Sequence, residues 1–311
     1  MDVYTELAGS RVSRLGIGCS NFGKRCDAAA SEEVVRTALD AGVNFFDVAD
    51  VYGGGTAEAL LARGLRGRRH EAIIATKFGH ATEEHREADE RGGHPRNVVR
   101  SAEASLRALE TDYIDLYQIH EPDPRVPVAE TLGALETLVE QGKVRWAGCC
   151  NFTLAQLTEA GRADRGVFRT VQNEYSLLVR DAERDVLPYC REAGLRFIPY
   201  FPLASGVLTG KYRMDQRVPP NSRVAQMKPD KLFRFFTPRA IDLVETLVVH
   251  GEACGHSVLE LALGFHFAEP AILSVIAGAM SGEQVRANAA AADAAADLPP
   301  ATIRYLRDLR C

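Results

Sequence analysis

Short apolar runs alternate with longer segments of helical periodicity along most of the chain. The runs are rich in Val, Ile and Phe and are bounded by Gly, Asn or Asp, which is typical of buried strands. A short hairpin precedes the first strand, which is expected to end near Gly18 and Cys19. The other seven expected strands are VNFFDV, AIIATKF, YIDLYQIH, VRWAGCCNF, TVQNEYS, LRFIPYFPL and ILSVIAG. Strands and helices that alternate in this way predict parallel β/α units.

Capping and punctuation signals mark the expected helix boundaries. Ser31 is expected to cap a helix that runs to about Ala41, with acidic residues in its first turn. Pro95 opens a helix to Leu109, and Gly142 closes the helix that follows a proline-rich segment. Further helices are predicted from about 56, after 152, at 181–193, 238–254 and 258–267, from about 281, and at 302–309.

Eight β/α units fit either a closed barrel or a doubly wound sheet. A doubly wound dinucleotide-binding fold is expected to carry G-x-G-x-x-G after its first strand. The nearest match here, GIGCSNFG, has its third glycine too late. The count of strands therefore favours an (α/β)8 TIM barrel with an N-terminal β-hairpin and a C-terminal helical tail. Such barrels commonly reach this length, so we expect one domain over residues 1–311.

Composition narrows the classes of partner. A net charge of −5, with 46% hydrophobic and 25% charged residues, gives no reason to expect nucleic acid. No apolar run is long enough to span a membrane, and the first ten residues do not resemble a signal peptide, so a cytoplasmic protein is expected. The seven cysteines are scattered without C-x-x-C, which favours neither disulfides nor a metal site. The sequence leaves the oligomeric state open.

Polar side chains occur at three consecutive strand ends. Asp47 ends the second strand, Tyr52 lies in the glycine-rich loop above it, and Lys77 and His120 end the third and fourth strands. Taken singly, each has an ordinary structural explanation. The carboxyl ends of barrel strands meet at one mouth, however, so the four side chains together predict a catalytic site there.

These four residue types suit proton delivery to a carbonyl oxygen while hydride arrives at its carbon. Tyr52 would be the acid, and the Lys77 ammonium would lower its pKa. Asp47 would keep Lys77 charged, and His120 would donate a hydrogen bond to the substrate oxygen. None of these groups can supply hydride, so a nicotinamide cofactor is required.

Two long polar segments are expected to be loops near this mouth. The first, 79–93, contains His80, His85 and His94, whose mixed spacing favours solvated histidines over a metal site. The second, 204–236, is rich in Gly, Pro, Arg and Lys and is expected to be functional. The substrate pocket is expected to be lined by Phe22, Tyr52, Phe78 and His120.

Several motifs together resemble those of the aldo-keto reductases. FDVADVYG, ATKFG and LYQIHEPD match the strand signatures of that family, and GCCNF, VQNEYS, YFPLASGVLTGKY and SVIAGAMSGEQVRAN follow in the same order. The resemblance covers nearly the whole chain. It implies an (α/β)8 barrel that binds extended NADP(H) without a Rossmann unit, and a catalytic tetrad of Asp47, Tyr52, Lys77 and His120 with Tyr52 as general acid/base.

The resemblance also implies cofactor contacts. Asn151 and Gln172 would bind the nicotinamide carboxamide, and Tyr200 would stack on its ring. The pyrophosphate would follow Phe201, Leu203, Ser205 and Gly206, with Lys211 and Arg223 near its phosphates. The adenosine end would lie at Gly278, Ser281, Gln284 and Asn288. Further cofactor contacts are expected from Gly18, Cys19, Asp47 and Cys150.

The chain departs from the family pattern in places. Cys150 and Phe201 stand where serine is common, and no cation follows the last strand. A preference for NADP(H) over NAD(H) therefore rests on Lys211 and Arg223, and the alternative is that both are ordinary surface cations.

The resemblance implies reduction of an aldehyde or ketone, such as a sugar or keto-metabolite, to the alcohol. Two alternatives remain open. One is an NAD-dependent sugar or alcohol dehydrogenase, and the other is a nucleotide-binding, redox-sensing subunit similar to potassium-channel β subunits.

Overall fold

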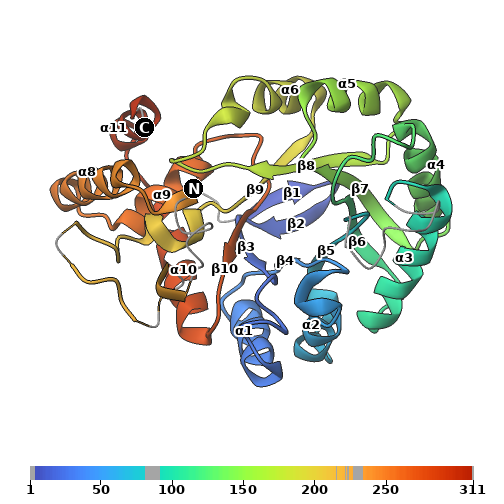
Figure 1. Ribbon diagram of the computed structural model, residues 1–311, viewed down its shortest axis with the longest axis horizontal. Coiled ribbons are helices and arrows are strands. Elements are labelled where there is room, and N and C mark those ends of the chain that lie inside the picture. The colour runs from blue at the N-terminus through green and yellow to red at the C-terminus, as the bar shows by residue number, and fades with distance from the viewer. Residues whose placement is uncertain are drawn as a thin grey trace.

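The computed structural model describes residues 4–80, 92–214, 216–220, 222, 224–226 and 234–309. Its centre is a barrel of eight parallel strands in the order β10-β3-β4-β5-β6-β7-β8-β9, surrounded by helices (Figure 1). The strands are β3 (Leu15–Gly18), β4 (Phe45–Asp47), β5 (Ile73–Phe78), β6 (Ile114–Ile119), β7 (Val144–Cys150), β8 (Phe168–Glu174), β9 (Arg196–Tyr200) and β10 (Val275–Gly278). The expected (α/β)8 barrel is confirmed.

The strand order leaves β9 and β10 at its two ends, and the residues just before β10 connect them. The Leu273 amide donates to the Phe197 carbonyl at 2.8 Å, and the Phe197 amide donates to the Ala271 carbonyl at 2.7 Å. The segment before β10 therefore completes the circuit against β9 with backbone hydrogen bonds. A closed ring leaves few unpaired strand edges, which is why a barrel can be formed from such short strands.

The helices follow the strands along the chain. They are α1 (Ala28–Asp40), α2 (Ala57–Leu65), α3 (Pro95–Ala108), α4 (Val128–Glu140), α5 (Leu154–Ala163), α6 (Val186–Ala193), α8 (Pro238–Cys254), α9 (Val258–Phe267), α10 (Gly282–Ala295) and α11 (Pro300–Asp308). The predicted boundaries agree closely for α8 and α9, and α10 and α11 form the expected C-terminal helical tail. No helix in the described part of the chain is long and apolar enough to cross a membrane.

One predicted cap is wrong. Helix α1 begins at Ala28, and Asp27 is its N-cap, with Oδ1 accepting from the Ala30 amide at 2.9 Å. Ser31, the predicted cap, lies inside the helix and is fully buried. Aspartate and serine are both good N-cap residues, so the position of the cap depended on which of the two side chains faces the core.

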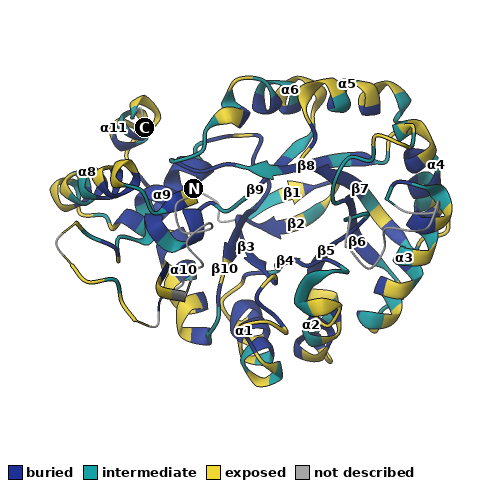
Figure 2. Ribbon diagram, viewed as in Figure 1, coloured by how far each residue is buried: buried dark blue, intermediate teal, exposed yellow. Residues whose placement is uncertain are grey.

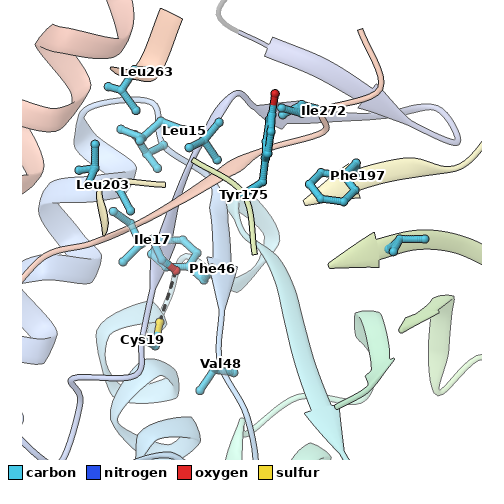
Figure 3. Packing of buried hydrophobic residues seen from close by; sticks show 14 of the residues in the cluster. Leu15, Ile17, Cys19, Phe46, Val48, Tyr175, Phe197, Leu203, Leu263 and Ile272 are labelled. Atoms are coloured by element: carbon cyan, nitrogen blue, oxygen red, sulfur yellow. Dashed lines mark hydrogen bonds between the residues drawn. The ribbon is translucent and has the colours of Figure 1, made fainter. Parts of the chain in front are cut away.

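Two apolar clusters hold the barrel together. The larger fills the layer between strands and helices and includes Leu15, Ile17 and Phe46 (Figures 2 and 3). The smaller lies inside the barrel near the start of the strands. Its members are Leu7, Val12, Phe45, Ile73, Ala75, Leu116, Ile198, Leu273 and Ile276.

The N-terminal hairpin closes this end of the barrel. It consists of β1 (Tyr4–Leu7) and β2 (Ser10–Ser13), paired antiparallel, and Leu7 and Val12 belong to the interior cluster. Thr5 anchors the hairpin through a hydrogen bond from Oγ1 to the Leu273 carbonyl at 2.7 Å. Apolar side chains thus fill the amino-terminal half of the barrel, and its other end remains for polar groups.

A buried carboxylate joins β5 and β6, the strands that carry Lys77 and His120. Asp115 on β6 is fully buried and accepts from the Ile74 amide at 3.0 Å. Arg69 reaches the same oxygen at 2.8 Å, and Arg145 on β7 reaches the other at 2.9 Å. Every oxygen of this carboxylate is therefore paired, as a buried charge requires.

We predict that Asp115→Ala lowers the free energy of unfolding by about 3–5 kcal/mol, because it leaves the partly buried Arg69 and the Ile74 amide without their acceptor. Urea denaturation measures the change. The matched control is Glu103→Ala, which breaks the surface pair with Lys143 and should cost less than about 1 kcal/mol. Equal losses in the two variants would contradict the assigned role of Asp115.

Candidate active site

The side chains of Asp47, Tyr52 and Lys77 meet at the carboxyl end of the barrel. Lys77 Nζ donates to Asp47 Oδ2 at 2.6 Å and to the Val48 carbonyl at 2.9 Å. The Tyr52 hydroxyl lies 3.4 Å from the same nitrogen. Lys77 is only 1% exposed and Asp47 only 4%. The structure therefore brings three of the four predicted catalytic side chains into contact, and two of them are shielded from water.

Strand register explains why Asp47 and Lys77 meet. Asp47, the last residue of β4, is paired with Ala75 of β5. Ala75 belongs to the cluster inside the barrel, and side chains two residues apart along a strand share a face. Lys77 consequently continues the interior face of β5 and lies one step above the end of β4.

A tight turn returns Tyr52 over the mouth. Tyr52 opens the short 3-10 helix η1 (Tyr52–Gly54), in which Gly53 has a positive φ of 60°. A Cβ at Gly53 would lie 2.3 Å from the Phe22 carbonyl oxygen. Only glycine fits this close approach at position 53. Gly54 and Gly55 also have positive φ values, of 66° and 86°, but no such close neighbour.

Burial and neighbouring charge act differently on the pKa values of Lys77 and Tyr52. Burial is the largest single effect on Lys77 and opposes its charge, but the Asp47 carboxylate, with smaller contributions from Tyr52 and Cys150, raises the pKa of Lys77 above its usual range. For Tyr52, burial is the largest effect and raises the pKa above 10.0, although Lys77 acts to lower it. Lys77 therefore acts in the predicted direction, but desolvation exceeds its effect, so the pKa of Tyr52 is raised overall and not lowered.

His120 completes the group of four. It follows β6, and its amide donates to the Phe78 carbonyl at 2.8 Å. Its ring stands edge-on to that of Tyr52, with centroids 5.8 Å apart. Burial, assisted by the charges of Lys77 and His80, lowers the pKa of His120 to about 2. The imidazole is thus neutral near pH 7, and its Nδ1 is buried without a hydrogen-bond partner among the described residues.

Two further polar side chains lie beside His120. The His80 ring is tilted against it, with centroids 4.8 Å apart, and His80 Nδ1 lies 2.9 Å from Glu121 Oε1. His80 is predicted from the sequence to be a solvated loop residue, and Glu121 is not predicted to belong to the site, although each lies two residues after a strand end. His94 lies elsewhere, as the N-cap of α3, and His85 is outside the described residues.

The residues predicted to hold a nicotinamide carboxamide are tied to the site. Gln172 Nε2 donates to Asp47 Oδ1 at 2.8 Å, so both oxygens of Asp47 are occupied. Asn151 adopts a positive φ of 63°, donates to the His120 carbonyl at 3.1 Å and accepts from the Tyr200 hydroxyl at 2.8 Å. The side chains of Asn151, Gln172 and Tyr200 therefore lie on the same side of the barrel mouth.

The segment after β9 is strained and holds an unpartnered polar atom. Phe201, Ser205 and Gly206 have φ values of 50°, 59° and 92° around the start of η5 (Ala204–Thr209). Ser205 Oγ is buried, with no hydrogen-bond partner among the described residues. Lys211 Nζ lies 3.3 Å from the position that a Cβ on Gly206 would take. Left-handed turns of this kind form concavities of backbone N–H groups that suit anions.

The predicted adenosine contacts gather at the start of α10. Ser281 is its N-cap and accepts from the Gln284 amide at 3.3 Å, while Gln284 Oε1 accepts from the Met280 amide at 2.9 Å. Gly278, at the end of β10, is exposed, and Asn288 is 7% exposed on the second turn of the helix. The four residues lie at a helix N-terminus, where the helix dipole favours negative charge.

Several residues predicted to contact the cofactor or the substrate are buried in the protein. Phe22, Phe78 and Cys19 are 0% exposed and belong to the larger core cluster. The prediction that Phe22 and Phe78 line a substrate pocket is therefore wrong for this arrangement, and the Cys19 thiol is equally inaccessible. Gly18, Cys150 and Leu203 are also buried. Arg223 lies outside the described residues.

A second buried carboxyl, which the sequence analysis did not single out, lies behind the site. Asp50 donates from its amide to the Lys77 carbonyl at 3.4 Å, and its Oδ1 is buried without a hydrogen-bond partner. Burial, with a smaller effect from the Glu58 carboxylate, raises the pKa of Asp50 to about 7. Glu58 itself accepts from Thr76 Oγ1 at 2.6 Å. Among the described residues no cluster of His, Cys, Asp or Glu could hold a metal ion.

Comparisons with known proteins show the family of this chain. The model of the Aldo/keto reductase family matches residues 14–310. The uncharacterized oxidoreductase YrpG of Bacillus subtilis (strain 168) is 33% identical over 319 residues, or 98% of this chain and 94% of that protein. A probable voltage-gated potassium channel subunit beta of Oryza sativa subsp. japonica is 32% identical over 306 residues, or 95% and 92% of the two chains.

A solved structure is similar as well. An aldo/keto reductase from Klebsiella pneumoniae, in complex with NADP and acetate, superposes with a TM-score of 0.72 at 28% identity, covering 96% of this chain and 91% of that one. The chain belongs to the aldo/keto reductase family and is an oxidoreductase. The resemblance drawn from the sequence motifs is confirmed.

We predict that Asp50→Asn stabilises the protein above pH 7 and has little effect near pH 4. The folded protein keeps this carboxyl protonated to about pH 7, whereas the unfolded chain releases the proton near pH 3.8. Stability is therefore lost as the pH rises between these values. The amide removes that loss and should raise the free energy of unfolding by roughly 1–3 kcal/mol at pH 8.

Urea denaturation at several pH values measures this effect. The control is Asp112→Asn, which changes an exposed carboxyl and should not alter the dependence of stability on pH. A parallel shift of the Asp50→Asn protein at all pH values would show that the carboxyl does not titrate as assigned.

Proposed function

We propose that the protein is an NADP(H)-dependent oxidoreductase that reduces an aldehyde or ketone, such as a sugar or keto-metabolite, to the alcohol. The observation that carries this proposal is the contact of the Tyr52 hydroxyl with the buried Lys77 ammonium, which Asp47 holds in place. A hydroxyl beside a fixed positive charge is suited to give up a proton. Membership of the aldo/keto reductase family supports the same reaction.

The reduced dinucleotide supplies hydride when it is bound. The residues of the chain supply the proton and stabilise charge. Tyr52 donates its proton to the carbonyl oxygen as negative charge develops there, and Lys77 stabilises the phenolate that remains. Neutral His120 donates a second hydrogen bond to the same oxygen. Asp47 keeps Lys77 charged and oriented.

The residues present fit an extended dinucleotide. Tyr200 offers an aromatic face at the mouth, and the amides of Asn151 and Gln172 lie on the same side. The buried Ser205 hydroxyl lacks a partner among the described residues, and a phosphate oxygen would satisfy it. Lys211 lies beside the same turn, where its charge would favour a pyrophosphate. The Klebsiella pneumoniae relative was solved with NADP, which supports the choice of dinucleotide.

The adenosine end would lie at the start of α10. Ser281, Gln284 and Asn288 share that end of the helix, and Gly278 precedes it. Their polar groups and the positive end of the helix dipole suit the ribose and its phosphate. Preference for NADP(H) over NAD(H) rests on Lys211 and on Arg223.

A nucleotide-binding subunit is the second candidate function. The similarity to a plant protein described as a probable potassium channel subunit beta favours it. This reading keeps the nucleotide site but requires slow turnover. Binding of NADPH together with negligible reduction of a broad aldehyde and ketone panel would favour it over the reductase.

We predict that Tyr52→Phe lowers kcat for carbonyl reduction by about 10²–10⁴-fold, because it removes the proton donor. Binding of NADPH should change little, since the ring and its turn are retained. Loss of NADPH absorbance measures turnover, and nucleotide fluorescence measures the Kd. The control is Tyr305→Phe on the remote helix α11. A Tyr52→Phe protein with parental activity would refute the assigned acid.

We predict that the protein binds NADPH more tightly than NADH and that Lys211→Met raises the Kd for NADPH about three- to tenfold, the loss expected for one charge-assisted phosphate contact. Fluorescence titration measures both values. Lys143→Met, which removes a lysine paired with Glu103, is the control. Tighter binding of NADH would instead indicate the NAD-dependent dehydrogenase.

A further inference from the structure

The proton that Tyr52 gives away must be replaced before the next turnover. On one side, Tyr52 contacts Lys77, whose hydrogen bonds lead to Asp47 and to the Val48 carbonyl. Lys77 and Asp47 are almost completely buried, and the second Asp47 oxygen is bound by Gln172. Among the described residues, this side of Tyr52 ends in the barrel interior and offers no exit to water.

The other side of Tyr52 leads outward. Its ring and that of His120 are nearly perpendicular, with centroids 5.8 Å apart, and His120 in turn packs against His80. The side chain of His80 is 37% exposed, and that of Glu121, 2.9 Å from His80 Nδ1, is 42% exposed. Titratable groups thus form a continuous series from the buried hydroxyl to the surface, through two imidazoles and a carboxylate.

We propose that His80, held by Glu121, acts through His120 as a proton relay that returns a proton from solvent to Tyr52 after each turnover. The inference rests on the proposed function, because it assumes that Tyr52 is the acid. Cofactor and substrate would cover the mouth above Tyr52, so that direct access of water to its hydroxyl is lost while both are bound. An imidazole suits the role because one ring nitrogen can accept a proton while the other donates one.

The proton transfers balance without any redox step. In the reduction, the O–H bond of Tyr52 breaks, its proton joins the substrate oxygen, and a phenolate remains. His120 gives the proton on Nε2 to the phenolate and accepts another at Nδ1, which has no partner among the described residues. Its starting tautomer returns once the product has left, when Nε2 takes a proton from water at the open mouth and Nδ1 releases one toward His80. The ring separation of 4.8 Å leaves the transfer to Nδ1 to a bridging water, for which an unpaired buried nitrogen is a suitable site. His80 then recovers its proton from bulk water.

Glu121 has a separate part in this arrangement. Its carboxylate oxygen lies 2.9 Å from His80 Nδ1 and places a negative charge beside that ring. It also restricts rotation of the His80 ring, keeping one face against His120. Glu121→Gln should therefore produce a weaker form of the His80 defect and should not alter nucleotide binding.

The first test uses turnover. His80→Phe keeps a ring against His120 but cannot carry a proton, and it should lower kcat about tenfold with little change in the Kd for NADPH, a smaller loss than that of a direct acid. His80→Ala should show a similar loss, and imidazole added to the buffer should restore most of it. His70→Phe is the matched control, since His70 is exposed before β5, at the opposite end of the barrel.

The second test needs no turnover. In protein labelled with 15N-histidine, NMR measures how fast the His120 ring proton exchanges with water, with and without NADP+. Because burial opposes direct protonation of His120, exchange should depend on the neighbouring imidazole and slow about tenfold in His80→Phe. Imidazole rescue of His80→Ala combined with this slowing would support the relay.

The results separate this inference from the proposed function. Parental kcat and unchanged exchange in His80→Phe would overturn the relay while leaving Tyr52 as the acid. Failure of the parental protein to reduce any carbonyl would count against the proposed function, and the exchange measurement would still decide whether His80 connects His120 to water. An equal loss of kcat in His70→Phe would also overturn the relay, because the effect would not be local.

Discussion

The contact between Lys77 and Asp47 is the constraint on which the rest of the mouth depends. An ammonium that is 1% exposed would be strongly destabilising without a partner, and Asp47 supplies one at 2.6 Å. Gln172 occupies the other carboxylate oxygen, so the pair is satisfied as well as neutralised. Because Asp47 and the Val48 carbonyl fix Lys77 in this way, its third contact is with the Tyr52 hydroxyl. A buried ion pair here specifies the position of the proposed proton donor.

The two ends of the barrel contain different kinds of side chain. Apolar side chains and the N-terminal hairpin fill the end at which the strands begin, and Asp115 ties β5 to β6 there. The strand ends are thus held in register by groups that lie away from the proposed catalytic residues. The opposite end concentrates the costly features, namely buried charges and the left-handed turns at Asn151 and Ser205. Strain of this kind persists only where the surrounding structure enforces it.

Desolvation sets the ionisation of the mouth as much as neighbouring charge does. Burial raises the pKa of Tyr52 and lowers that of His120, so both carry the protons that a donor and a neutral hydrogen-bonding group need near pH 7. The positive charge of Lys77 lowers the pKa of both groups: it favours the phenolate form of Tyr52 and disfavours the imidazolium form of His120. The same cation therefore prepares the tyrosine to release a proton and keeps the neighbouring imidazole uncharged.

The sequence by itself determined the alternation of strands and helices, the closed barrel and the convergence of Asp47, Tyr52, Lys77 and His120. These features depend on periodicity and on the rule that parallel strands end at one mouth, both of which are local or topological. Only the tertiary structure decided that Asp27 rather than Ser31 caps α1, that Phe22 and Phe78 are fully buried, and that His80 and Glu121 stand against His120. It also decided that one carboxyl oxygen of Asp50 is buried without a hydrogen-bond partner and that burial outweighs Lys77 at Tyr52. The physical reason is common to all of these: side-chain direction and desolvation are set by the packing of segments distant in sequence, and no local pattern records them.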